Sequence, residues 1–223
     1  LVALATLDPS DVRFLRDHAI DGTPVMPGVF GIELFARAAS LFTASPRDLV
    51  FESVVFERPL KCHRNAPLEV IITLTRQGEE LQMTLESERT LRTGRVERTQ
   101  HFRAQYALES GAPAWELIVL GGDDLKQLGP DREAIYDAFF HTGCFQIMDS
   151  VPFAGPSAMV GRGTRPSEDP APGLGMDGLL SGPFIREAAL QTAGLHAMNR
   201  TGHMHLPASI GRCVIHQTVA PGE

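Results

Sequence analysis

Residues 28–33 are Gly-Val-Phe-Gly-Ile-Glu, and residues 182–187 are Gly-Pro-Phe-Ile-Arg-Glu. Each hexapeptide opens an apolar stretch with helical spacing, so we predict helices over Gly28–Phe42 and Pro183–Met198. Aligned without gaps, both stretches carry Gly first, Phe third and Glu sixth. This internal repeat predicts two similar halves, each with an antiparallel sheet wrapped around its own helix.

The sequence between and after these helices predicts an α+β chain in two units. A Ser/Gly/Pro-containing connection at Leu108–Pro113 puts the boundary between an N-terminal half, 1–113, and a C-terminal half, 114–223. We expect a short helix over Asp131–Phe140. Alternating segments rich in Val, Ile and Thr predict strands at Leu49–Phe56, Leu68–Thr75, Leu81–Ser87, His101–Leu108, Met159–Gly163 and Ile210–Val219.

Composition excludes several classes of protein. The 223 residues carry 20 Lys and Arg against 27 Asp and Glu, a formal net charge of −7, so no basic nucleic-acid surface is expected. No apolar run approaches the roughly 18 residues of a membrane span. Three widely spaced cysteines, Cys62, Cys144 and Cys213, indicate a reducing compartment. We therefore expect a cytoplasmic protein with no membrane contact.

The N-terminus shows no basic flank followed by an apolar segment, so no signal peptide is expected there. The chain does not begin with Met, and we expect it to be part of a longer protein.

Residues 18–28, His-Ala-Ile-Asp-Gly-Thr-Pro-Val-Met-Pro-Gly, carry the strongest chemical signal. They place His18 on a loop fixed by Gly22 and Pro27, just before an apolar helix. A helix N-terminus offers unpaired N–H groups that can stabilise an oxyanion, and a nearby neutral His can take a proton from the carbon next to a carbonyl. From spacing alone, a turn with a surface His is an equally good interpretation.

Three blocks of the chain together resemble the dehydratase domains of modular polyketide synthases and polyunsaturated fatty-acid synthases. His18, Gly22 and Pro27 match that family's HxxxGxxxxP motif. Residues 140–146, Phe-His-Thr-Gly-Cys-Phe-Gln, resemble its (F/Y)-(H/Y)-G-P-x-F-Q segment, and residues 187–191, Glu-Ala-Ala-Leu-Gln, resemble its D-A-A-L-Q helix. The resemblance implies a double hotdog fold, two consecutive hotdog halves, in agreement with the internal repeat.

The chain departs from the family pattern at three places. Glu187 stands where modular enzymes have Asp, although stand-alone 3-hydroxyacyl-carrier-protein dehydratases use Glu at this point. Thr142-Gly143 replaces the Gly-Pro step, and Gly182-Pro183 replaces a His-Pro pair. The second change bears on the shape of the acyl channel, and only the first touches the chemistry directly.

The resemblance implies one active site that eliminates water from a 3-hydroxyacyl thioester. His18 would be the base and Glu187 the acid, with the N–H groups of Gly28 and Val29 polarising the thioester carbonyl. Such an acid needs a raised pKa, which apolar neighbours such as Phe184 and Leu190 can provide. Glu33 would be a remnant of the repeat. The residues expected to bind substrate are Gly22, Pro27, Gly28, Val29, Phe145 and Gln191.

The resemblance also implies the partners. The substrate would be tethered by phosphopantetheine to an acyl carrier protein beside neighbouring synthase domains, with no dissociable cofactor and no metal. We expect a homodimer.

Other functions stay open at this point: a double-bond isomerase with nearly the same residues, a catalytically silent or docking hotdog domain, and, less favoured, a thioesterase. His196, His203 and His205 lack zinc-ligand spacing, and Ser181 and Ser209 lack the G-x-S-x-G elbow of a serine hydrolase.

Overall fold

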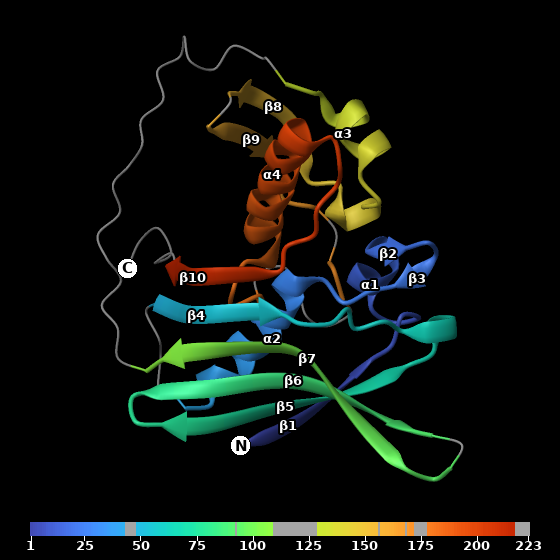
Figure 1. The fold of residues 1–223 in the computed structure, drawn as a ribbon, viewed down its shortest axis with the longest axis vertical. Coiled ribbons are helices and arrows are strands. Elements are labelled where there is room, and N and C mark those ends of the chain that lie inside the picture. The colour runs from blue at the N-terminus through green and yellow to red at the C-terminus, as the bar shows by residue number, and fades with distance from the viewer. Residues whose placement is uncertain are drawn as a thin grey trace.

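A computed structural model describes residues 1–42, 48–91, 93–108, 129–155, 157–167, 169–171 and 178–216. Its largest element is a six-stranded sheet in the order β1-β5-β6-β7-β4-β10 with antiparallel pairing throughout (Figure 1). The strands are β1 (Val2–Leu7), β4 (Asp48–Phe56), β5 (Leu68–Gln77), β6 (Glu80–Thr90), β7 (Val96–Ala107) and β10 (Ser209–His216).

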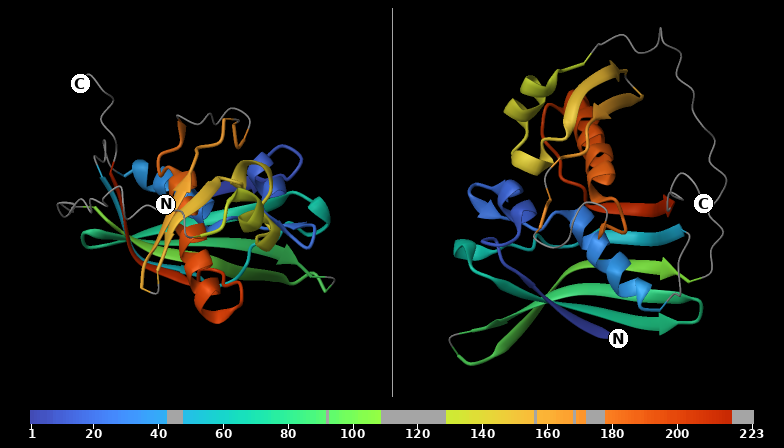
Figure 2. Two further views of the ribbon diagram at one scale, coloured as in Figure 1. Left: turned by 90° about the horizontal axis from the view of Figure 1, so that it is seen from above. Right: turned by 180° about the vertical axis from the view of Figure 1, so that it is seen from behind.

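Helix α2 (Gly28–Ser40) lies against one face of this sheet, as the rear view in Figure 2 shows. The strands bury alternate residues toward it: Leu81, Met83 and Leu85 of β6 are buried, with more exposed residues between them. The helix is buried along most of its length, including Val29, and its two charged residues, Glu33 and Arg37, pair with each other.

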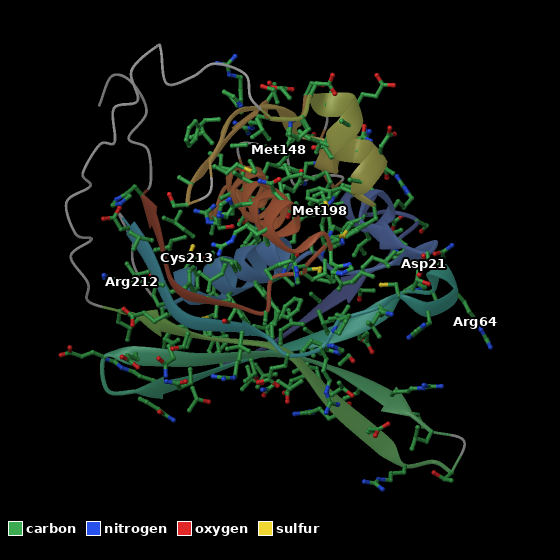
Figure 3. The ribbon with its side chains drawn as sticks, turned by 45° about the horizontal axis from the view of Figure 1, so that its top comes forward. Asp21, Arg64, Met148, Met198, Arg212 and Cys213 are labelled. Atoms are coloured by element: carbon green, nitrogen blue, oxygen red, sulfur yellow. The ribbon has the colours of Figure 1, made fainter. Side chains whose placement is uncertain are left out.

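The second helix, α4 (Pro183–Thr201), packs against the hairpin of β8 (Met148–Ala154) and β9 (Met159–Gly163). Helix α3 (Arg132–Ala138) packs on β8, and a small separate hydrophobic core lies among α3, β8 and α4. Figure 3 labels Met148 and Met198 beside α4. The residues of this core are Ile135, Phe139, Met148, Val151 and Leu195.

The two parts of the molecule are joined in two ways. Strand β10, which follows α4, pairs with β4 and so extends the sheet of the first part. Helices α2 and α4 also touch, with the rings of Phe30 and Phe184 edge to face at 5.7 Å between centroids. One hydrophobic core therefore runs from the large sheet to the start of α4.

Short elements complete the chain around the start of α2. They are α1 (Arg13–Asp17), β2 (Ala19–Ile20), β3 (Thr23–Pro24) and two single turns of 3₁₀ helix, η1 (His63–Asn65) and η2 (Gly143–Phe145). None of the described helices has the length and apolar character needed to cross a membrane.

Both predicted long helices are confirmed, as are the short helix, which spans α3, and the predicted strands, with ends shifted by a few residues. Strand β1 was not predicted, because Val2, Ala3, Leu4 and Ala5 place apolar residues on both faces and so hide the two-residue period. Strand β8 was missed because Pro152 interrupts it. The expected boundary at 113/114 and the end of the last predicted strand lie outside the described residues.

Candidate active site

His18 lies at the base of a tight hairpin. The Val25 N–H donates to His18 O at 3.0 Å, and His18 Nδ1 lies 2.8 Å from Val25 O. Asp21, labelled in Figure 3, and Gly22 form the turn with φ of 49° and 72°, the positive pair that two-residue hairpins favour. Gly22 thus acts through its backbone conformation, which sets His18 opposite Val25.

The environment of His18 keeps its imidazole neutral. Burial lowers its pKa from 6.5 to about 4, against the opposing effect of the Glu187 charge. Because a carbonyl oxygen only accepts, the contact with Val25 O assigns the ring proton to Nδ1. Nε2 is then an unprotonated base at neutral pH.

The start of α2 offers backbone donors beside this base. Pro27 is the N-cap, and its carbonyl accepts the N–H groups of Phe30 and Gly31. The preceding N–H groups, of Gly28 and Val29, have no acceptor inside the helix. A side chain at Gly28 would overlap the Phe56 ring, with a Cβ 2.7 Å from its Cε1, whereas the Val29 side chain is fully buried in the core.

Glu187 and Gln191 lie one turn apart on α4, and both are buried. Gln191 Nε2 donates to Glu187 Oε1 at 3.0 Å and to the Phe145 carbonyl at 3.0 Å. His141 Nε2 lies 3.2 Å from the same Oε1 atom.

The expected rise in the pKa of Glu187 is wrong. Burial alone raises this pKa, but the hydrogen bonds from His141 and the Gln191 N–H, together with the electrostatic effect of the nearby His141 and His18 imidazoles, outweigh burial. The pKa lies below its ordinary value, because the His141 and Gln191 side chains are hydrogen-bonded to the carboxyl.

His141 is a site residue to which sequence analysis assigned no role. It is buried, stacks on Phe140 at 4.3 Å between centroids, and its ring centroid lies 5.3 Å from that of His18. Its place inside the 140–146 block was the available signal. Its contact with Glu187, which is far away in sequence, required the folded structure.

Phe145 supports the site from behind. Its side chain is fully buried, with its ring 5.2 Å from that of His18, and it does not line the cavity described below. Its carbonyl accepts a hydrogen bond from Gln191 Nε2 and lies 3.3 Å from the Tyr136 hydroxyl oxygen. Phe145 therefore contacts the residues of the site rather than the open space.

The Thr142-Gly143 step fits closely against the residue before His18. The Thr142 N–H and hydroxyl both donate to Asp17 O, and the Cys144 N–H donates to Asp17 Oδ2 at 2.9 Å. Gly143 has φ of 49°, and any side chain there would overlap the Asp17 carboxylate. This departure from the family pattern thus ties the 140–146 block to the His18 hairpin.

A cavity of about 480 Å³ lies between the segment that carries His18 and helix α4, which carries Glu187. His18, Gly28, His141, Glu187 and Gln191 line it, together with mainly apolar residues. The remaining lining residues are Ile20, Val25, Met26, Phe56, Arg58, Pro59, Lys61, Phe102, Phe139, Phe140, Leu190, Gly194, Met204, His205, Leu206, Pro207 and Ala208.

Glu33, the counterpart of Glu187 in the repeat, has a different environment. Its carboxylate accepts the backbone N–H groups of Leu180 and Ser181 at 3.0 and 2.7 Å and pairs with Arg37 at 2.9 Å. These partners account for its burial, and Glu33 does not line the cavity. The described residues contain no cluster of three His, Cys, Asp or Glu side chains that could hold a metal ion.

The family comparison matches the part of the chain that carries His18. Residues 1–88 match the model of the polyketide synthase dehydratase domain. This part of the chain is therefore similar to that family. No curated protein matches the chain significantly.

Solved dehydratase domains share the fold over nearly the whole chain. The dehydratase domain of a trans-AT polyketide synthase from Brevibacillus brevis matches with a TM-score of 0.75 and 19% identity, covering 95% of this chain and 75% of that one. The dehydratase of the CurF module of curacin polyketide synthase gives 0.77 and 16%, covering 98% and 78%. That of PpsC from Mycobacterium tuberculosis gives 0.74 and 19%, covering 96% and 80%. The predicted double hotdog fold is confirmed.

Proposed function

We propose that the chain is a dehydratase domain that eliminates water from a 3-hydroxyacyl thioester to give a 2-enoyl thioester. The observation that carries the proposal is the placement of His18 and Glu187, from opposite ends of the chain, on the wall of one mainly apolar cavity. This pair supplies a neutral base and a carboxyl group, the two groups that a syn or anti elimination of water needs.

In the proposed reaction, His18 Nε2 takes the proton from the α carbon. The electron pair of that C–H bond forms the double bond, and the bond from the β carbon to the hydroxyl breaks as Glu187 gives its proton to the leaving oxygen. Water leaves, His18 is protonated and Glu187 is a carboxylate. A proton transfer from His18 back to Glu187, through solvent once the product has gone, restores the site.

Glu187 can act as the acid despite its lowered pKa. An acyl group that fills the cavity removes water from the carboxyl, and this desolvation favours the neutral form in the complex. The donors that lower the pKa of Glu187 also stabilise the carboxylate left behind. The N–H groups of Gly28 and Val29 are the proposed donors to the thioester oxygen.

The proposed substrate is carried on the phosphopantetheine of an acyl carrier protein within a synthase of polyketide or polyunsaturated fatty-acid type. The cationic side chains Arg58 and Lys61 line the cavity and suit the approach of an anionic phosphate. The proposal includes neighbouring synthase domains, a homodimer, a cytoplasmic location and no dissociable cofactor.

Related dehydratases support the choice of chemistry. One solved structure is described as a His-to-Phe inactive mutant of the CurJ dehydratase, and another as an Asp-to-Asn inactive mutant of the CurK dehydratase. A His and an acidic residue are the residue types that we propose at 18 and 187.

The test is turnover of a synthetic 3-hydroxyacyl thioester, followed by mass spectrometry for the loss of water. The parent chain should turn over and His18→Ala should lose about 10²- to 10⁴-fold in rate. Movement of a double bond in a 2-enoyl thioester without loss of water would indicate an isomerase. No reaction with either substrate by the folded parent would indicate a silent domain.

A further inference from the structure

A row of hydrogen-bonded side chains leads from α3 to the carboxyl of Glu187. The Tyr136 hydroxyl donates to Gln191 Oε1 at 3.0 Å, and Gln191 Nε2 reaches both Phe145 O and Glu187 Oε1. The Phe145 carbonyl can only accept, so it fixes the orientation of the Gln191 amide. Glu187 Oε1 therefore accepts a hydrogen bond from the Gln191 N–H group whether the Glu187 carboxyl is charged or neutral.

His141 contacts the same oxygen, and its surroundings decide which ring nitrogen carries the proton. Nε2 is 3.2 Å from Glu187 Oε1, while Nδ1 is buried and has no hydrogen-bond partner among the described residues. A buried N–H without an acceptor is rarer and more costly than a bare acceptor lone pair. The proton is therefore assigned to Nε2, which makes His141 a second donor to Oε1.

Because two donors contact Glu187 Oε1, the other carboxyl oxygen, Oε2, is the one free to transfer a proton. In the part of the chain that the structure describes, no hydrogen bond is formed with Glu187 Oε2. Oε1 already accepts from Gln191 and His141, so a proton on Glu187 belongs on Oε2, the oxygen that remains available to the cavity.

We propose that His141 is a positioning residue whose Nε2–H holds Glu187 Oε1, keeps the transferable proton on Oε2 and stabilises the carboxylate formed when that proton leaves. The inference rests on the proposed dehydration. The titratable side chains that face Glu187 are His18 from the segment before α2, Tyr136 from α3 and His141. Arg58, Lys61 and His205 line the same cavity. Of these, His141 alone is hydrogen-bonded to the Glu187 carboxyl in the described structure.

Two substitutions separate this role from packing. His141→Phe keeps a flat ring against Phe140 but has no donor, whereas His141→Gln keeps an N–H and loses the ring. We expect His141→Phe to lower kcat roughly 10- to 100-fold with little change in KM. The alkaline limb of its kcat profile should move up by about one pH unit, because Glu187 loses a donor that favours its charged form. His141→Gln should restore most of kcat and the position of the limb. Equal loss in both variants with an unmoved limb would overturn the inference.

A second measurement does not depend on turnover. In ¹⁵N NMR of histidine-labelled protein, with His141 assigned from the spectrum of His141→Phe, the parent should show a proton on Nε2 of His141. A ring protonated on Nδ1 alone would overturn the inference. A parent chain without dehydratase activity would contradict the proposed function, whereas the NMR spectrum would still show which ring nitrogen of His141 carries the proton.

Discussion

Glu33 and Glu187 occupy equivalent places in the repeat, yet their partners differ. Glu33 is held by two backbone N–H groups and Arg37, whereas Glu187 contacts side chains that line a cavity. Glu187→Gln should abolish most turnover and leave substrate binding, because an amide cannot deliver the proton. Glu33→Gln should leave kcat nearly unchanged but lower the free energy of unfolding by about 1–3 kcal/mol, since an amide N–H would face backbone donors.

Steady-state kinetics and urea unfolding of both variants check this contrast. An inactive Glu33→Gln variant with an active Glu187→Gln variant would mean that the two halves have exchanged roles.

The burial of His18 also predicts a dependence of stability on pH. Its pKa is 6.5 in the unfolded chain and about 4 in the folded one, so between these values the unfolded chain binds more protons. The free energy of unfolding should therefore fall as the pH drops from 6.5 to 4, by at most about 3 kcal/mol. Solvent screening of the partly exposed His18 ring makes this fall smaller. Urea unfolding at pH 7, 5 and 4 measures this, and His18→Ala should lack this part of the decline. Parallel curves for parent and variant would contradict it.

For individual residues, the sequence indicated which side chains form the site but not what each one does there. The resemblance to dehydratase domains implied that His18, Gly28, Glu187 and Gln191 belong together, and all four line the cavity. Val29 and Phe145 are buried behind it, and Gly22 forms the turn that sets His18. His141 could not be assigned a role, because its partner on α4 is brought near only by the fold.

Two glycines let helix α2 approach its sheet closely. Side chains at Gly28 and Gly31 would overlap the rings of Phe56 and Phe102, which pack edge to face at 5.4 Å between centroids. Gly31→Ala should lower the free energy of unfolding by about 1–3 kcal/mol, because its Cβ would lie 2.5 Å from the Phe102 ring. Thermal or urea unfolding measures the loss.

The matched control is Gly211→Ala on β10, where an added Cβ meets nothing within 4 Å. A Gly31→Ala protein as stable as this control would show that the helix can move away from the sheet at no cost.

Helices and strands whose apolar residues recur with a single regular spacing were predictable from the sequence. Elements held in place by pairing with distant segments were not. The two long helices carry a helical apolar pattern, and β5 and β6 alternate. Strand β1 is held by its pairing with β5, and the two-residue strands β2 and β3 by their turn, so neither has a local pattern of its own.

Phe30 connects the parts of the molecule. Its ring stacks on Phe14 at 3.9 Å and meets Phe145 and Phe184 at 6.1 and 5.7 Å between centroids. Phe30→Ala should lower the free energy of unfolding by about 3–5 kcal/mol and, because both parts share this core, leave a single transition. Circular dichroism and hydrogen exchange during urea unfolding check both statements. Phe42→Ala, at an exposed position just after α2, is the control. Two separate transitions would contradict one cooperative unit.

The pairing of β10 with β4 has a consequence for how the protein is made. Strand β4 can form its antiparallel partnership with β7 early, but its other edge stays open until β10 has left the ribosome. His18 likewise waits for Glu187, which is synthesised much later. During translation the nascent chain therefore exposes an unpaired strand edge and carries the proposed base without the proposed acid. We expect it to be chemically inert and most prone to misassociate just before β10 emerges.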